Sequence, residues 1–412
     1  MMWSPKKLCH NNCLLKFTWH WSGMQSLFQN THSRFFLILL TMGSFSLGMT
    51  EYSMIGLSNE IAADLKLTNH QTSQVMSAYA MGVLIGAPLL AILGSKLNRH
   101  TLMAYLLLWC ACGNLFISFA HSYEQLRWLR TLNGFPHGLY FSTAALLIYD
   151  VFPKNKRANY IGVMFSGIGL ALVVAVPFNT WVGEMQGWRY MYRFMALIDL
   201  LILVLLHNLS PTLPLQHQNS ITQGLRAFKN PKVWWVLLLG ATVISGKVGV
   251  LTYAEHIVME ITHLHGSLLP VIIMCVGLGM TTGSLLGGKL ASLNLQKTLF
   301  GAICWIMVVM VLVRLLAPDV HTVYLAFYFL GTITVFIPAL QVLIIDYTQP
   351  YATLPSAAYH SALNCGNAAG PLLSSILIGA GYGYLSSTWV GLALAVCAAV
   401  IYVLGRTYLR PV

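Results

Sequence analysis

Twelve apolar stretches, separated by mostly short connections, dominate this sequence. Each is long enough to form a helix across a hydrocarbon core, which needs about 20 residues. They lie near residues 35–57, 72–94, 101–120, 125–151, 158–183, 188–208, 232–257, 267–290, 297–317, 321–346, 356–380 and 386–406. Only 8% of the residues are charged, whereas a soluble domain carries about 25%. The sequence therefore predicts an all-α membrane protein with 12 transmembrane helices.

The longest internal connection divides these stretches into six and six. It runs from residue 210 to 231 and holds three of the 15 prolines. We expect an N-terminal cytoplasmic tail over 1–34, a six-helix bundle over 35–208, a central cytoplasmic loop over 209–231, and a second bundle with a short tail over 232–412. The first 33 residues contain no acid, and we assign them no function. Met24 is an alternative start, so the sequence leaves open whether residues 1–23 belong to the mature protein.

Lysine and arginine predict the orientation of these helices. With the N-terminus inside, 16 of the 23 basic residues fall on inner segments and four on outer ones. Basic residues concentrate in cytoplasmic loops of membrane proteins. Both termini are therefore expected in the cytoplasm.

The two halves also contain similar sequences. Residues 82–102 align with residues 279–299 at a constant offset, and Gly82, Gly86 and Thr101 meet identical partners. Parallel repeats of this kind occur in transporters whose halves rock around a site near the bilayer midplane. The repeat predicts two pseudo-symmetric bundles with a binding site between them.

Several functions are excluded or disfavoured by composition and motifs. The net charge of +12 comes from scattered short turns, which does not indicate a nucleic-acid interface. We find no phosphate-binding loop, no nucleophile with its base, no disulfide framework and no recognised metal-ligand spacing, even around His256, His263 and His265. We expect no enzyme activity, no cofactor and no metal.

Glu51 is the only ionisable residue in the first apolar stretch. A carboxylate at membrane depth costs several kcal/mol, so it usually faces a polar interior and has a partner or a function. Protonation removes that cost, so Glu51 is our first choice for proton coupling. A position at the membrane surface, or structural neutralisation, is the alternative.

Lys247 lies about 15 residues into the seventh stretch, and the repeat places it one position from the counterpart of Glu51. We therefore expect Glu51 and Lys247 to face each other across the cavity. A snorkelling or structural lysine is the alternative.

Several motifs resemble the major facilitator superfamily, specifically its drug:proton antiporter branch and the arabinose-efflux-permease-like members. The resemblance covers roughly residues 35–406. The segments that carry it are GMTEYSMIGLSNEIAADL (48–65, similar to the opening helix and outer loop), RTLNGFPHG (130–138), GWR (187–189), TY (252–253), PALQ (338–341) and ALNCGNAAG (362–370). It implies the major facilitator fold, a monomer in a bacterial inner membrane, and proton and small-molecule partners within a lipid bilayer.

The resemblance also identifies Arg130, in the fourth-helix motif, as a residue that could hold backbone groups or tune a nearby acid. An ordinary helix-end arginine is the alternative. In the expected gating loop, Lys96 and Arg99 retain positive charge, but Ser95 replaces the usual aspartate. The antiporter motif of the fifth helix is also altered around Pro177, which makes antiport less certain than transport.

Polar and aromatic residues inside the apolar stretches are expected to line the substrate cavity, with helix packing as the alternative for each of them. They are Tyr52, Tyr79, His137, Tyr140, Tyr253, Gln341, His360, Asn364 and Asn367.

The leading hypothesis is proton-coupled efflux of a small organic solute by alternating access. Uptake by a symporter or facilitator is the nearest alternative, and a transport-inactive sensor or scaffold is the alternative from another class. The sequence leaves the substrate, direction, coupling ion and oligomeric state open.

Overall fold

The computed structural model describes residues 33–209 and 221–406. Most of the predicted N-terminal tail (1–32), part of the predicted central loop (210–220) and residues 407–412 lie outside the described residues. The described part consists of helices joined by short connections and contains no strand.

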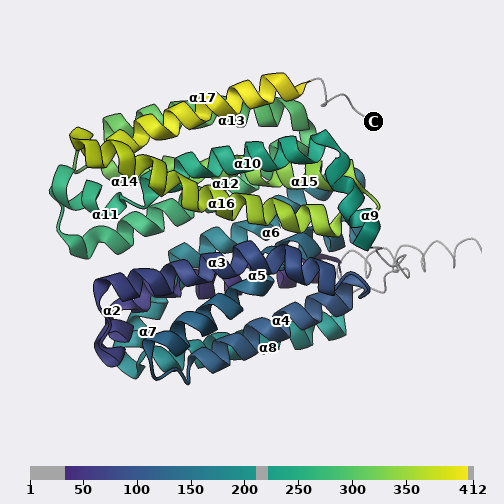
Figure 1. Ribbon diagram of the computed structural model, residues 1–412, viewed down its shortest axis with the longest axis horizontal. Helices are drawn as coiled ribbons and strands as arrows, with labels where there is room; N and C mark the ends of the chain where they lie inside the picture. Colours follow the sequence, from purple (N-terminus) through teal and green to yellow (C-terminus); the bar gives the residue numbers. More distant parts are fainter. Residues whose placement is uncertain (1–32, 210–220, 407–412) are drawn as a thin grey trace, which may run out of the picture.

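Figure 1 shows two groups of helices packed side by side. The N-terminal group contains the helix over residues 33–51, α2 (Ser53–Leu65), α3 (Asn69–Leu93), α4 (Arg99–Ile117), α5 (Tyr123–Val151), η1 (Lys154–Lys156), α6 (Arg157–Leu170), η2 (Ala171–Ala175), α7 (Val176–Gln186) and α8 (Trp188–Leu209). The C-terminal group contains α9 (Ile221–Arg226), η3 (Ala227–Lys229), α10 (Pro231–Leu251), α11 (Ala254–His256), η4 (Ile257–Ile261), η5 (Gly266–Leu268), α12 (Leu269–Leu293), α13 (Leu295–Leu316), α14 (Val323–Thr332), η6 (Ile333–Phe336), α15 (Ile337–Thr348), α16 (Thr353–Leu377), η7 (Ile378–Tyr382) and α17 (Ser386–Gly405). The two groups meet where α16 packs on α3 and α5, and where α12 packs on α6.

Ten helical spans in the described residues are long and apolar enough to cross a membrane. Two further helices, α5 and α16, have comparable lengths of 29 and 25 residues. Both contain many polar side chains, among them Arg130, Asn133 and His360, and these are buried inside the protein. Burial within the bundle lets such residues occupy a helix at membrane depth, because they are not exposed to lipid.

Helix α2 extends further than the sequence suggested. The stretch up to Leu65 was expected to be an outer loop, but it continues as a helix that ends where Lys66 adopts a left-handed backbone with φ of 53°. Helical spacing explains the difference, since Met54, Leu57 and Ile61 bury one face of α2.

Close helix packing in the N-terminal group depends on two glycines. A Cβ on Gly82 would lie 1.9 Å from the carbonyl oxygen of Thr131, and a Cβ on Gly134 would lie 2.3 Å from that of Tyr79. The contacts recur in the C-terminal group exactly one repeat later, between α12 and α14. There, Cβ atoms on the glycines at 279 and 331 would meet the carbonyl oxygens of residues 328 and 276 at 2.0 and 2.1 Å. The internal repeat therefore extends from sequence to backbone packing.

Candidate functional site

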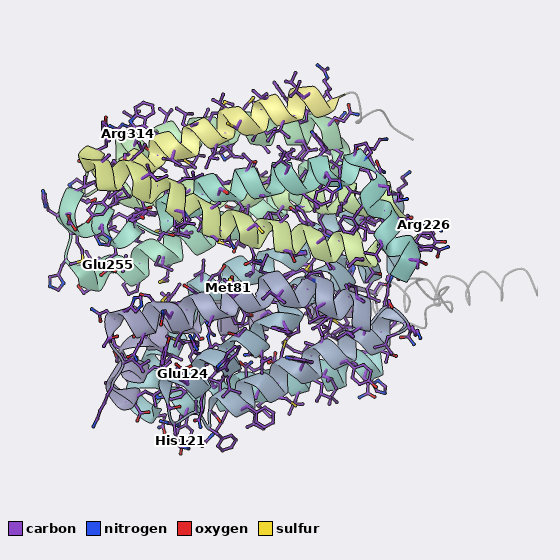
Figure 2. The ribbon with its side chains drawn as sticks, viewed as in Figure 1. Met81, His121, Glu124, Arg226, Glu255 and Arg314 are labelled. Carbon is purple, nitrogen blue, oxygen red and sulfur yellow. The ribbon has the colours of Figure 1, made fainter. Side chains whose placement is uncertain are left out.

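A cavity of about 500 Å³ lies between the two groups of helices. It extends from the end of the bundle that carries α2 and α11, where Glu255 lies (Figure 2), to the middle of α5 and α16. The residues that line it are Glu51, Tyr52, Ile55, Met76, His137, Phe141, Phe165, Ile168, Leu172, Ile244, Lys247, Val248, Leu251, Thr252, Ala254, Glu255, Leu269, Ile273, Val276, Met280, Ser284, Thr334, Ile337, His360, Leu363, Asn364 and Asn367. Mixed apolar and polar walls of this kind are typical of small-molecule sites.

Glu51 and Lys247 both line this cavity, from opposite groups of helices. Lys247 is only 4% exposed. The two side chains interact electrostatically, yet no ion pair within 4.0 Å joins them among the described residues. The ion-pair contact recorded for the carboxylate of Glu51 is with Nε2 of His137, 3.8 Å from Oε2.

An interruption of the first helix positions Glu51. The helix turns at Tyr52, where the N–H of Ile55 donates to the carbonyl of Tyr52 at 3.0 Å. A regular helix would instead direct that N–H to the carbonyl of Glu51. The freed carbonyl of Glu51 lies 3.4 Å from Nη2 of Arg130. Irregular backbone at membrane depth is tolerated where protein groups satisfy it in this way.

Arg130 is 1% exposed, and its guanidinium stabilises the backbone at this interruption. Its Nη1 donates to the carbonyl of Thr50 at 2.8 Å and to the hydroxyl of Ser53 at 3.2 Å. Its guanidinium also lies 4.7 Å from the ring centroid of Tyr79. These contacts hold the backbone on both sides of Glu51.

A buried polar network, formed by side chains of neighbouring helices, supports the residues that precede the same turn. Asp199 on α8, 1% exposed, accepts hydrogen bonds from Ser46 at 2.6 Å and from Nδ2 of Asn114 at 2.9 Å. Asn114 also contacts the hydroxyl of Thr50 at 3.0 Å and accepts from Nδ2 of Asn133 at 2.8 Å. The network connects α4, α5 and α8 to the residue that precedes Glu51.

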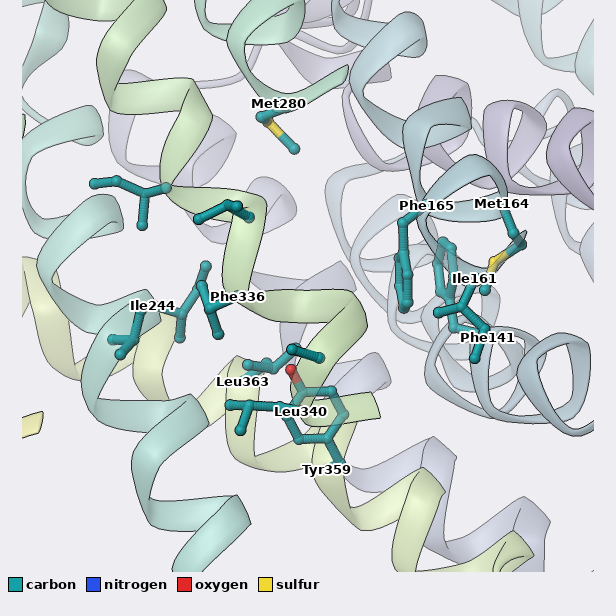
Figure 3. Packing of buried hydrophobic residues seen from close by; sticks show 14 of the residues in the cluster. Phe141, Ile161, Met164, Phe165, Ile244, Met280, Phe336, Leu340, Tyr359 and Leu363 are labelled. Carbon is teal, nitrogen blue, oxygen red and sulfur yellow. The ribbon is translucent and has the colours of Figure 1, made fainter. Parts of the chain in front are cut away.

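Aromatic rings form the floor of the cavity. Phe141 stacks on Phe165 with ring centroids 5.1 Å apart, and Figure 3 shows these two side chains next to each other. His360, from the opposite group, stacks on Phe141 at 5.6 Å. Nε2 of His360 lies 3.1 Å from Oε1 of Gln341, whose amide donates to Ser356 at 2.6 Å. The floor therefore includes side chains of both groups.

Beyond this floor, the two groups are joined directly at the end opposite α2 and α11. The hydroxyl of Tyr149 on α5 reaches the carbonyl of Val342 and the carboxylate of Asp346 on α15. Nearby, Arg99 forms a 2.6 Å ion pair with Asp150, so the expected gating loop has an acidic partner on α5 although Ser95 is not an acid. Lys96 is exposed.

Five of the nine expected cavity residues line the cavity: Tyr52, His137, His360, Asn364 and Asn367. The other four lie outside its wall, and their polar atoms contact the surrounding protein. The hydroxyl of Tyr79 bonds to Nδ1 of His137, that of Tyr140 donates to the carbonyl of Leu40, and that of Tyr253 donates to the carbonyl of Pro371. Gln341 is fully buried behind His360.

Sequence reasoning missed other residues of the cavity. Phe165, Ser284 and Thr334 line it, but an ordinary aromatic or small polar residue in an apolar helix gives no distinguishing signal. Asn114 had a usable signal, since an amide in an apolar stretch needs a hydrogen-bond partner when buried.

The histidines after α10 do not assemble a metal site. Within the described ranges, no group of three or more His, Cys, Asp or Glu residues could hold a metal ion. His256 stacks on Tyr384 instead, with centroids 4.5 Å apart. The pKa of Tyr384 is raised above its ordinary value, mainly by desolvation of its hydroxyl and to a smaller extent by the neighbouring carboxylate of Glu260.

Comparisons with known proteins identify the class of molecule to which this architecture belongs. The family model described as "Major Facilitator Superfamily" matches residues 36–351. "Inner membrane transport protein YdhP" of Escherichia coli is 30% identical over 349 residues, covering 84% of this chain and 90% of that protein. A "Probable sugar efflux transporter" of Helicobacter pylori is 25% identical over 364 residues, covering 88% and 93%.

Among solved structures, the fold is similar to that of FucP, described as a Major Facilitator Superfamily transporter in the outward conformation. The TM-score is 0.74 at 15% identity, over 91% of this chain and 99% of FucP. The family match confirms the resemblance seen in the sequence motifs. The chain is a multi-pass inner-membrane protein that belongs to the Major Facilitator Superfamily, a family of small-solute transporters and not of enzymes.

Proposed function

We propose that this protein exports a small organic solute by proton antiport, through alternating access to the cavity between its two groups of helices. The observation that carries the proposal is the presence of Glu51 and Lys247, on opposite groups, in one cavity of about 500 Å³. Charged groups in membrane-spanning helices usually mark substrate or proton pathways. The protein is proposed to work as a monomer, with protons and a small molecule as its partners.

The proposed topology has twelve membrane-spanning helices, with α5 and α16 added to the ten apolar spans. The first bundle comprises residues 35–208 and the second 232–412, joined by the cytoplasmic segment 209–231. The excess of lysine and arginine on one side supports cytoplasmic termini. In this orientation the α2 and α11 end of the cavity faces outward, and the Tyr149 contact closes the cytoplasmic end.

Glu51 is proposed to carry the proton. While the cavity is open, water can reach its carboxylate, and protonation removes the charge that would otherwise be buried when the cavity closes. The proton leaves after the groups have rocked and the cavity opens on the other side. Lys247 is the complementary charge on the second group, and a direct bridge to Glu51 would form only if the groups approach.

The remaining residues are assigned supporting roles. Arg130 positions Glu51 by holding the interrupted backbone. Tyr52, His137, His360, Asn364 and Asn367 contact the solute. The gating loop acts through the ion pair of Arg99 with Asp150, while Lys96 contributes surface charge.

The export direction is supported by the relative named as a sugar efflux transporter. Uptake by symport or facilitated diffusion uses the same cavity, so transport assays must decide the direction. A transport-inactive sensor would bind a solute and change conformation without moving it across the membrane.

The test is counterflow in proteoliposomes with a panel of labelled sugars, nucleosides, drugs and amino-acid derivatives, with and without an imposed pH gradient. We expect the gradient to stimulate the flux of at least one solute, and Glu51→Gln to remove that stimulation. Glu124→Gln is the matched control, because Glu124 lies on the surface in an ion pair with Arg127 (Figure 2). Wild-type stimulation in Glu51→Gln would refute the assigned proton carrier.

A further inference from the structure

Lys247 and Glu51 have opposite charges in one cavity, and the one ion-pair contact recorded for either among the described residues is Nε2 of His137, 3.8 Å from Oε2 of Glu51. Among the described residues, no ion pair or hydrogen bond is recorded for the ammonium of Lys247, and Oε2 of Glu51 is buried without a hydrogen-bond partner. Arg130 is close to Glu51, but its Nη1 and Nη2 donate to backbone carbonyls and to the hydroxyl of Ser53, and no ion pair between its guanidinium and the Glu51 carboxylate is recorded among the described residues. Such charges become costly when the cavity closes and removes water from them, unless a ligand supplies the counter-charges. Both charges are thus available to a ligand.

We infer that the transported solute is a zwitterion, an amino acid or related aminocarboxylate with an aromatic or large apolar side chain. Its carboxylate would bind Lys247 and its ammonium group would bind Glu51. This inference rests on the proposed function and adds the chemical class of the solute. A single ligand of this kind contacts both groups of helices, as closure around it requires.

The apolar part of the cavity suits such a side chain. Phe141 and Phe165 are almost parallel, with an interplanar angle of 8°, and His360 stacks beside them. Stacked or edge contacts with a ligand ring add to the stabilisation that comes from the buried area alone. Aliphatic residues continue the wall: Ile168, Leu172, Ile244 and Leu363.

A sugar fits this chemistry less well. Its hydroxyls need many hydrogen-bond partners, but the amide of Asn364 donates to the carbonyl of His360, and that of Asn367 donates to Asn364. A neutral sugar would also leave Lys247 and Glu51 without counter-charges.

Glu255 lies beyond the interruption at Thr252 and Tyr253, nearer the α11 end, and provides a second acid on the entry path.

The assignment also explains how a proton and a solute could exchange. A protonated Glu51 cannot attract the ammonium group of the ligand, so proton and zwitterion occupy this carboxyl group in alternation. Mutually exclusive binding at one group produces antiport when the carrier reorients only with the proton or the zwitterion bound.

The test measures binding by the purified, detergent-solubilised full chain at fixed pH, without a gradient. Four probes share one side chain and differ in the charges of the amino and carboxyl groups: L-phenylalanine, its cationic amide, its anionic N-acetyl derivative, and the neutral N-acetyl amide. We expect the zwitterion to bind at least about tenfold more tightly than the others, because each of the other probes lacks at least one of the two charges.

The two charged residues should control different parts of this selectivity. Lys247→Met should remove the preference for L-phenylalanine over its amide, and Glu51→Gln should remove the preference over the N-acetyl derivative. Glu124→Gln and Lys289→Met, both at exposed positions, should leave the selectivity unchanged. If Lys247→Met fails to fold, Lys247→Arg should fold and retain the preference, and the probe series on the wild-type protein still tests the inference.

Equal affinity for all four probes, tightest binding of the neutral probe, or no binding of any probe would overturn the zwitterion assignment. If a sugar showed gradient-stimulated counterflow in the same preparation, the proposed function would stand without this inference. Absence of gradient-stimulated flux for every solute, despite tight and charge-selective binding of L-phenylalanine, would instead refute the proposed function.

Discussion

The hydroxyl of Tyr149 lies 3.0 Å from Oδ1 of Asp346, and the two residues occupy equivalent positions in the two repeats, 197 residues apart. The same hydroxyl is 3.1 Å from the carbonyl of Val342. On the N-terminal side, the guanidinium of Arg157 lies 4.5 Å from the ring centroid of Tyr149 and donates to its carbonyl at 2.8 Å. The contact joins α5 to α15 at the closed end of the cavity.

Tyr149→Phe should therefore shift the protein away from the conformation described here. The substitution removes hydrogen bonding to a carboxylate, worth about 1–3 kcal/mol, and changes little else. We expect slower modification of a cysteine placed at Met76, on the cavity wall, by a membrane-impermeant maleimide in a chain whose eight native cysteines are replaced.

Tyr105→Phe is the control for this measurement, because Tyr105 is 55% exposed on α4. It should label at the parent rate. Equal rates in Tyr149→Phe and the parent would mean that the Tyr149 contact does not hold this end closed.

Gly82→Ala should destabilise the protein by about 1–3 kcal/mol, the usual cost of overpacking a tight contact. Its Cβ would collide with the carbonyl of Thr131, and backbone cannot move aside as a flexible side chain can. Gly279→Ala should behave in the same way, since its Cβ would meet the carbonyl of Tyr328 at 2.0 Å.

Gly301→Ala is the matched control for both substitutions, because a Cβ there has no atom within 4 Å. It should be neutral, or stabilising by up to about 1 kcal/mol through helix propensity. Thermal unfolding of the purified variants measures the difference. Similar melting temperatures for all three would show that α3–α5 and α12–α14 packing tolerates a methyl group.

Asn114→Ala should lower stability by about 1–3 kcal/mol for each buried polar group that it leaves without a partner. The affected groups are Oδ2 of Asp199 and Nδ2 of Asn133, both in the interior. The melting temperature of the solubilised protein is the measurement, and Asn59→Ala, at an exposed position of α2, is the control. An unchanged melting temperature would mean that water or a rearranged side chain replaces the amide.

Arg130→Lys should reduce gradient-stimulated flux although it keeps the positive charge. A lysine ammonium lacks the planar fork with which Arg130 reaches both Thr50 and Glu51, so the turn at Tyr52 would be held less firmly. Flux with and without a pH gradient distinguishes this positioning role from loss of folded protein. Arg127→Lys, one turn away on the surface, is the control, and equal stimulation in both variants would argue against positioning by Arg130.

Much of the architecture was predictable from sequence because membrane-spanning helices can be recognised by their composition. Apolar stretches of about 20 residues and the 197-residue repeat are local or periodic signals. The membership in the Major Facilitator Superfamily followed from motifs such as residues 130–138. Glu51 and Lys247 were identifiable because ionisable residues are rare in such helices.

The tertiary structure alone decided which polar residues face the cavity and which support its wall. Tyr140 and Gln341 look as suitable as His360 in sequence, but their polar atoms are used by the carbonyl of Leu40 and by Ser356. Likewise, nothing local predicts that Tyr149 meets Asp346. Hydrophobicity and charge are properties of each residue and can be read directly from the sequence. Hydrogen-bond partners depend on the rotation and depth of each helix, which are set by packing between segments that are distant in the chain.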